Sequence, residues 1–154
     1  MYGFPNADGV FVSSKVIPEA HLLGFVHYFL DNYYNFNPNS ALSNINEALR
    51  LMSNNLRARQ EQPLRIIATT SREQQITQTF TRNKSKDMSF EVTPQGYITK
   101  FEGDRYRSTL GKTFNHCKYE VALKLTPVRL SAHYAWGVVV DDISAREIRC
   151  ESST

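Results

Sequence analysis

Apolar residues in the first half of the chain recur at three- and four-residue steps, which is the spacing of one face of an α-helix. A first stripe lies between residues 18 and 36, where Pro18 suits a first helical turn and "NPN" at 37–39 ends the pattern. A second stripe follows Ser40, a suitable helix cap. Its members are Leu42, Ile45, Leu49, Met52 and Leu56. We therefore predict two helices whose apolar stripes form core rather than a binding site.

The next segment is less regular. Pro63 opens either a third helix or a short strand, and the β-branched residues that follow it favour a strand. The polar run "SREQQ" and the pair Ile76 and Phe80 favour a helix instead. We predict a helix for most of this segment.

From Met88 onward the pattern favours strands. "MSFEV", "YITKF" and "RYRSTLG" are predicted as short strands, separated by the turn signals "TPQG" and "EGD". "CKYEVALKLT" alternates clearly, and Pro127 behind it requires a bulge or an edge position. "HYAWGVVVDDI" is the predicted last strand, with a bulge at Gly137 and Trp136 as its core anchor.

Helices followed by strands predict an α+β domain, in which N-terminal helices pack on a curved antiparallel sheet of about four strands. We assign residues 1–15 to an extended lead-in, 16–148 to one domain and 149–154 to a flexible tail. We also expect Trp136 to be buried together with the second helical stripe, Leu42, Ile45, Leu49 and Met52.

Composition is that of an ordinary globular protein, with 41% hydrophobic and 21% charged residues among 154. The net charge of +3 is too mild to indicate nucleic-acid binding. Residues 50–86 nevertheless hold eight basic residues against Glu61 and Glu73. This segment is either a patch for an acidic partner or the solvated face of helices, and its scattered charges favour the second interpretation.

The sequence contains no recognisable catalytic or metal-binding motif. His116, Cys117, His133 and Cys150 could each bind a metal, but their spacing matches no zinc pattern. We expect no metal, no cofactor, no catalytic residue and no essential thiol, and the two cysteines leave a disulfide open. The aromatic residues Tyr34 and Phe36 fall off the first helical stripe, and we interpret them as a candidate protein-contact surface.

The order of these elements resembles one family. The lead-in "FPNADGVFV", the helix pair at 18–57, the strand "YEVALKL" and the closing "WGVVVDDI" are similar to the periplasmic domain of TraE-like, or VirB-eight-like, components of type IV secretion and conjugation machines. The resemblance covers nearly the whole chain. It implies a nuclear-transport-factor-two-like shape, a transmembrane helix before the lead-in, a location on the periplasmic side of the bacterial inner membrane, and no catalytic residues to carry over.

Three functional hypotheses follow. The first is a non-enzymatic scaffold of a secretion channel, with other channel subunits and itself, as a weak oligomer, for partners. The second is a small-ligand-binding or isomerase-like enzyme of the same cone-shaped fold, with His116 or His133 and one of Asp104, Glu120 and Asp141 in its pocket. The third and weakest is a nucleic-acid-binding module that uses residues 50–86.

Overall fold

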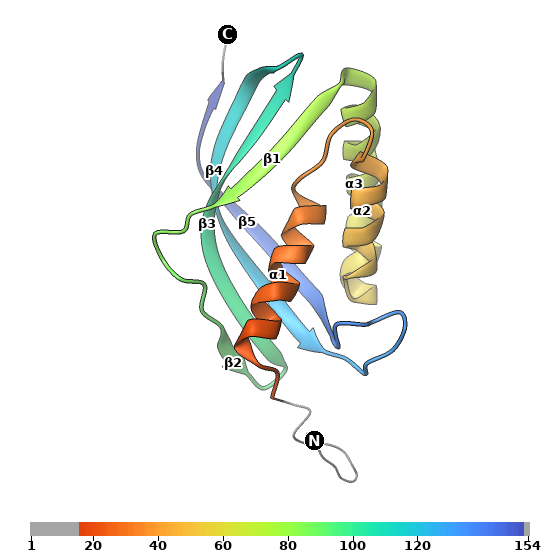
Figure 1. Ribbon diagram of the computed structural model, residues 1–154, viewed down its shortest axis with the longest axis vertical. Coiled ribbons are helices and arrows are strands. Elements are labelled where there is room, and N and C mark those ends of the chain that lie inside the picture. Colours follow the sequence, from red (N-terminus) through yellow and green to blue (C-terminus); the bar gives the residue numbers. More distant parts are fainter. Residues whose placement is uncertain (1–15, 153–154) are drawn as a thin grey trace.

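The structure, a computed structural model, describes residues 16–152 as three helices packed against one face of a long, curved sheet (Figure 1). The predicted lead-in at 1–15 lies outside the described residues. The elements in chain order are α1 Glu19–Tyr33, α2 Ala41–Arg50, α3 Asn54–Gln74, β1 Ile76–Arg82, β2 Glu91–Thr93, β3 Gly96–Thr109, β4 Lys112–Pro127 and β5 Val138–Ser152. The α+β class and the antiparallel sheet are as predicted.

The second apolar stripe spans two helices instead of one. α2 ends at Arg50 because the residues behind it pair with the start of β5: the Val140 amide donates to the Leu51 carbonyl, and the Ser53 amide donates to the Val140 carbonyl. The Ser53 hydroxyl then caps α3 by accepting the Leu56 amide at 3.3 Å. The chain therefore changes direction between α2 and α3, and this connection is hydrogen-bonded to the start of β5.

α3 is longer than predicted at its start and shorter at its end. Pro63 lies inside this helix, on its exposed side, and does not open it. The helix stops at Gln75, whose φ of 55° is left-handed, and β1 begins directly behind it. The predicted helix over the β1 segment is therefore wrong, because its β-branched residues pair with β3 along their whole length.

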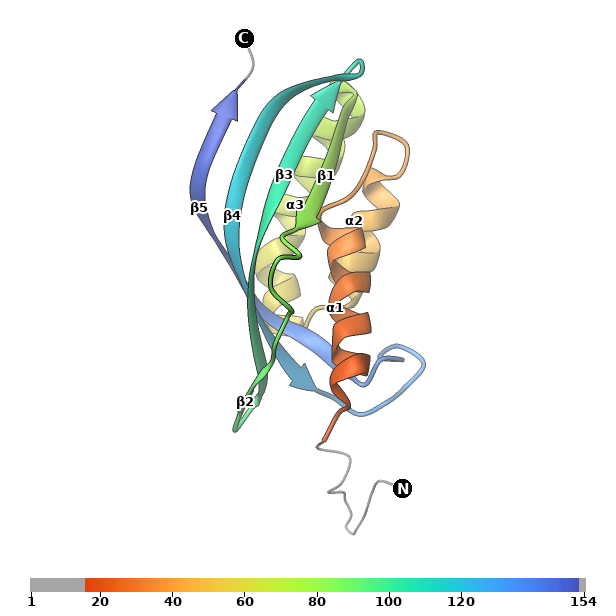
Figure 2. The same cartoon turned by 60° about the vertical axis from the view of Figure 1, so that its left-hand side comes forward.

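All pairings in the sheet are antiparallel, and its strand order is β1-β3-β4-β5, with the short β2 also on β3. β3, β4 and β5 have 14, 16 and 15 residues, so the sheet extends beyond the first helix at the end where β5 finishes (Figure 2). β5 runs to Ser152, so residues 149–152 form strand and not the predicted flexible tail.

The predicted turn at "EGD" lies instead in the middle of β3. Gly103 continues the strand, and a Cβ atom there would collide with the ring of Phe80 on neighbouring β1. A glycine inside a strand often marks such a close approach rather than a turn. One long strand therefore replaces the two short ones predicted over this segment.

The core lies between the helices and the concave face of the sheet. Phe25, Phe29 and Ile45 from the helices meet Val121 and Leu123 from β4, and all five are fully buried. The predicted alternation of β4 is confirmed, since residues 121, 123 and 125 point into this core.

Trp136 does not lie in a strand. β5 starts only at Val138, and Trp136 belongs to the turn before it, half-buried against α1, where its ring contacts those of His21, Phe25 and Tyr28. The prediction that Trp136 is buried together with the second stripe is therefore wrong, because its ring is half-buried and packs on α1. Ile45, Leu49 and Met52 are buried as expected, but Leu42 is 47% exposed.

Candidate functional site

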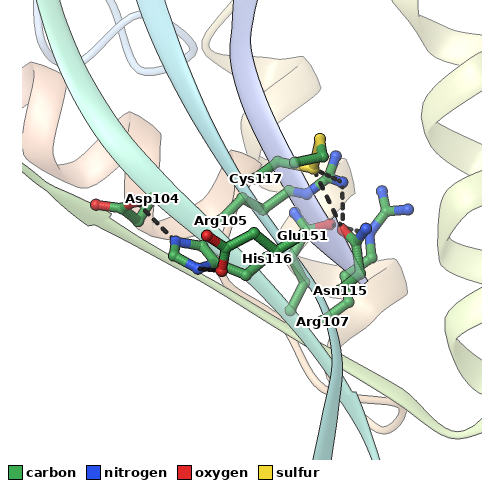
Figure 3. The surroundings of a disulfide bond; sticks show 9 residues. Asp104, Arg105, Arg107, Asn115, His116, Cys117 and Glu151 are labelled. Carbon is green, nitrogen blue, oxygen red and sulfur yellow. Dashed lines mark hydrogen bonds and ion pairs between the residues drawn. A yellow bond between two sulfur atoms is a disulfide. The ribbon is translucent and has the colours of Figure 1, made fainter. Parts of the chain in front are cut away.

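The far half of the sheet carries two different clusters of polar side chains, one on each face. Successive residues of a strand point to opposite faces, so Arg105 and Arg107 lie on the concave face with the helices, and Asp104 and Tyr106 lie on the convex face. Figure 3 shows Arg105, Asn115 and Cys117 gathered on one side of the strands and Asp104 with His116 on the other.

The convex cluster is an acid–histidine pair. Nε2 of His116 lies 2.8 Å from Oδ1 of Asp104, and its Nδ1 lies 3.7 Å from Oε1 of Glu151. The ring of Tyr106 stacks on the imidazole with centroids 4.3 Å apart. The enzyme hypothesis names this pair, His116 with Asp104, and the structure does bring it together.

The location of the pair does not suit catalysis. Both side chains are about one-third exposed and lie on the face of the sheet opposite the helices (Figure 2), so water reaches them. The other candidates are dispersed: Glu120 pairs with Arg146 at 3.0 Å, and His133 is exposed in the turn before β5. Asp141 sits at a bulge near the start of β5.

A shallow hollow of about 660 Å³ lies on α3. All its lining residues belong to one side of α3: Ala58, Glu61, Gln62, Arg65, Ile66, Thr69, Thr70 and Glu73. It contains neither a histidine nor any residue of the two sheet clusters, and one of its two carboxylates, Glu61, is paired with Arg65.

The concave cluster is built as a grid across four strands. One row runs Gln78, Arg107 and Asn115, and the neighbouring row runs Phe80, Arg105, Cys117 and Cys150. Nε of Arg107 donates to Oε1 of Gln78 at 2.9 Å, and Nη2 of Arg105 donates to Oδ1 of Asn115 at 2.9 Å. Neutral partners thus orient both guanidinium groups.

The positive charge of this cluster is not neutralised by the described residues. Neither Arg105 nor Arg107 belongs to any ion pair within 4.0 Å there. Burial, together with the neighbouring Arg105, lowers the pKa of Arg107. The Arg105 guanidinium lies over the ring of Tyr119, 5.2 Å from its centroid, in a cation–π contact.

A disulfide between Cys117 and Cys150 closes the concave cluster on the β5 side. The two residues are direct cross-strand neighbours of β4 and β5. With Glu147 they form the one group of three potential metal ligands among the described residues, all within 4.8 Å, but both thiols are used in the disulfide. The sequence left this pairing open because Cys150 was placed in a flexible tail.

The residues assigned to a contact surface are in the core. Tyr34 is 8% and Phe36 is 6% exposed, and the ring of Tyr34 stacks on Phe80 with centroids 4.4 Å apart. The Phe36 backbone pairs with Gln78 of β1 in both directions. This burial removes the exposed aromatic edge on which the prediction rested, and burial raises the pKa of the Tyr34 phenol above its ordinary value.

Within the basic segment 50–86, four of the five arginines on α2 and α3 contact acids or carbonyls of the fold. Arg50, Arg59 and Arg65 are ion-paired with Glu47, Asp142 and Glu61 respectively. Arg57 donates to the carbonyls of Leu49 and Met52 at the end of α2. Five of the eight basic residues lie on α2 and α3, whereas Arg82 ends β1 and Lys84 and Lys86 follow it. Sequence reasoning missed Arg105 and Arg107, although "RYR" within a strand places both arginines on one face.

No protein-family model matches the chain, and no curated protein matches it. Its fold does match solved structures. VirB8 of Agrobacterium tumefaciens superposes with a TM-score of 0.67 and 12% identity, over 92% of this chain and 98% of that one. An IcmL-like type IV secretion system protein of Legionella pneumophila superposes with a TM-score of 0.69 and 10% identity, over 86% of this chain and 95% of that one. A periplasmic fragment of TraM superposes with a TM-score of 0.64 and 12% identity, over 86% of this chain and 99% of that one.

These matches show that the chain has the fold of VirB8-like domains, which is nuclear-transport-factor-two-like. The resemblance predicted from the order of elements is confirmed at the level of fold. None of the helices in the described residues is both long and apolar enough to cross a membrane.

Proposed function

We propose that the chain is a periplasmic domain of a bacterial type IV secretion or conjugation machine, where it acts as a scaffold through contacts with other proteins. The observation that carries this proposal is the extent of the fold match. Three solved structures, which include an IcmL-like type IV secretion system protein and a periplasmic fragment of TraM, match over 86% or more of this chain and at least 95% of their own length.

The disulfide supports the proposed compartment. Structural disulfides persist in oxidising environments such as the periplasm and are rare in the bacterial cytosol. Cys117 is 2% exposed, and its bond to Cys150 joins the ends of two long strands far from the helical layer. Such a bond suits a domain that folds on the periplasmic side of the inner membrane, where an anchoring helix of the complete protein would hold it.

The geometry of the titratable groups favours a scaffold over an enzyme. In the described chain His116 is the histidine that pairs with acids, Asp104 and Glu151, and it lies on the convex face. The convex face also carries the pairs of Lys118 with Glu102 and Arg146 with Glu120, so the dyad continues a row of surface ion pairs. We interpret it as part of a solvated sheet face.

We infer that self-association is weak. The large exposed apolar residues, such as Ile66, Val92 and Leu130, are scattered over α3, β2 and the turn before β5, and so form no continuous apolar interface of the kind that obligate dimers need. Weak contacts still assemble when a membrane anchor raises the effective concentration of the partners. Sedimentation of this chain from micromolar to millimolar concentration should show a monomer that dimerises only at the upper end, and a tight dimer at nanomolar concentration would contradict this.

The proposal is tested with the full-length protein in the bacterium that encodes it. A tagged copy at its own locus is cross-linked, extracted from membranes with detergent and purified, and the retained proteins are identified by mass spectrometry. We expect channel subunits and the transport ATPases of a type IV machine to be enriched over an unrelated tagged inner-membrane protein. Recovery of the tagged protein in the cytosol, without such subunits, would contradict the proposal.

A further inference from the structure

The pair Arg105 and Arg107 is more than a structural feature of the sheet. The two arginines are two residues apart on one face of β3, which separates their Cα atoms by about 6.6 Å at the usual strand rise. Both are partly buried, and like charges at this separation repel each other where water is partly excluded. A fold gains nothing from this arrangement unless something compensates the charge.

The hydrogen bonds of the cluster leave donors unused. The buried Nε of Arg105 has no partner, and only one other buried side-chain nitrogen in the described chain, Nε of Arg82, shares this condition. Arg107 is held through its Nε by Gln78, so its two terminal nitrogens have no partner among the described residues. Gln78 itself is 4% exposed, and its Nε2 donates to the Tyr34 carbonyl, so its position is fixed.

The nearest acid does not neutralise the pair. Glu147 on β5 lies beside the disulfide sulfurs, within 4.8 Å, but it is exposed and forms no ion pair with either guanidinium within 4.0 Å. The remaining groups of the cluster, namely Asn115, Tyr119 and the disulfide, are uncharged. Within the described residues, the cluster therefore presents two guanidinium charges that no ion pair neutralises.

We propose that Arg105 and Arg107 form a receptor for a single carboxylate presented by a glutamate or aspartate of a partner protein. The terminal nitrogens of Arg107 form the planar fork that binds a carboxylate with two parallel hydrogen bonds, and Arg105 adds its charge from beside it. This inference rests on the proposed function, because it specifies the chemistry of a contact that the scaffold makes.

A nucleic acid fits the site less well. Binding of a polyanion uses a row of exposed basic side chains that follow its phosphates. In the concave cluster, as the described residues form it, the basic side chains are Arg105 and Arg107, and three of the arginines on α2 and α3 are already ion-paired. The main-chain amides of β3 and β4 are used in the sheet, so no cradle of backbone donors is available for a phosphate.

The binding test uses the purified 154-residue chain. Nitrogen-15 side-chain spectra, which resolve the Nε–Hε groups of arginines, are followed during titration with N-acetylglutamate, with its neutral analogue N-acetylglutamine, and with inorganic phosphate at equal ionic strength. We expect saturable shifts of the Arg105 and Arg107 signals with N-acetylglutamate in the millimolar range, and at least tenfold weaker effects with N-acetylglutamine. The Arg107→Gln variant should lose this response, and Arg129→Gln, which removes an exposed arginine elsewhere, should keep it.

Three outcomes would overturn the inference. The first is that N-acetylglutamate shifts the arginine signals without saturation. The second is that a folded Arg107→Gln variant, as judged by its backbone spectrum, binds N-acetylglutamate as well as the parent does. The third is that phosphate binds more tightly than N-acetylglutamate. A cellular arm separates this inference from the proposed function. If deletion of the gene abolishes transfer but the Arg107→Gln protein restores it fully, the receptor is wrong and the scaffold stands. If the deletion has no effect while N-acetylglutamate still binds, the proposed function fails and the site remains.

Discussion

Reduction of the Cys117–Cys150 disulfide should destabilise the domain by a few kilocalories per mole without unfolding it. The bond closes a segment with a sequence separation of 33 residues. In the chain-entropy description, cross-linking a loop of this length restricts the unfolded chain enough to stabilise the fold by about 3.7 kcal/mol at 25 °C. The strands stay paired on both sides of the bond, so the native sheet should survive its loss.

Urea unfolding, followed by circular dichroism, measures this contribution. At a typical slope of about 2 kcal/mol per molar urea, the midpoint should fall by about 2 M when the reductant dithiothreitol is added. The matched control is the double variant Cys117→Ala and Cys150→Ala, whose midpoint should be low and should not respond to dithiothreitol. Cys117 is buried, so alanine is preferred to serine, which would bury a hydroxyl group.

The reasoning fails if oxidised and reduced protein unfold at the same urea concentration. It also fails if a thiol assay under native, oxidising conditions finds two free cysteines. A third result, complete loss of structure on reduction, would show that the end of the sheet holds the domain together more strongly than the helix–sheet core does. In cells, the double alanine variant should restore transfer if it accumulates normally, because no thiol chemistry is proposed.

Three further outcomes are expected. Trp136→Ala should lower the free energy of unfolding by about 2 kcal/mol in urea melts. This loss is smaller than for a fully buried tryptophan, because the ring is only half-buried on α1. An unchanged midpoint would contradict the packing of Trp136 on α1. Gly103→Ala should cost about 1–3 kcal/mol in the same assay, since its methyl group meets the Phe80 ring, and a neutral effect would show that this ring moves freely. The hydrogen bond from Arg50 lowers the pKa of Glu47 from 4.5 to about 2, so this carboxylate adds stability that is complete above pH 4.5 and lost as the pH falls towards 2. The stability difference between the parent and Glu47→Gln should therefore shrink over that interval, and a constant difference would refute the assignment.

The sequence was sufficient where one periodicity dominated. The alternation of Val121, Leu123 and Leu125 predicted a half-buried strand, and the structure contains it. The helical stripes also predicted core correctly at Ile45 and Leu49. In these segments local pattern and tertiary packing demand the same structure, so single-sequence reasoning succeeds.

It failed where a distant residue decides the local conformation. Gly103 looks like part of a turn until the ring of Phe80, on another strand, is seen to need the space. The second helix breaks near Ser53 because Val140, far along the chain, takes its backbone hydrogen bonds. Tyr34 lies off the apolar stripe of α1 but is covered by β1, which was predicted as a helix.

The candidate site was out of reach for a related reason. His116 and Asp104 could be named as candidates, but which face of the sheet they occupy depends on the register of β3 against β4. The sequence alone does not distinguish Arg105 and Arg107 from other strand arginines, which are usually solvated. Their significance appears only when the acids of the described chain are seen to lie elsewhere.

The most direct test of the scaffold function is the frequency of substrate transfer by donor bacteria that lack the gene. We predict that an in-frame deletion abolishes transfer and that the full-length parent restores it. A full-length variant with Asp104→Asn and His116→Gln should restore it equally well, because the proposed scaffold uses this dyad only as part of a solvated sheet face. Normal transfer by the deletion strain would contradict the assignment to the machine, and failure of the stably accumulated dyad variant would contradict the scaffold in favour of an enzyme.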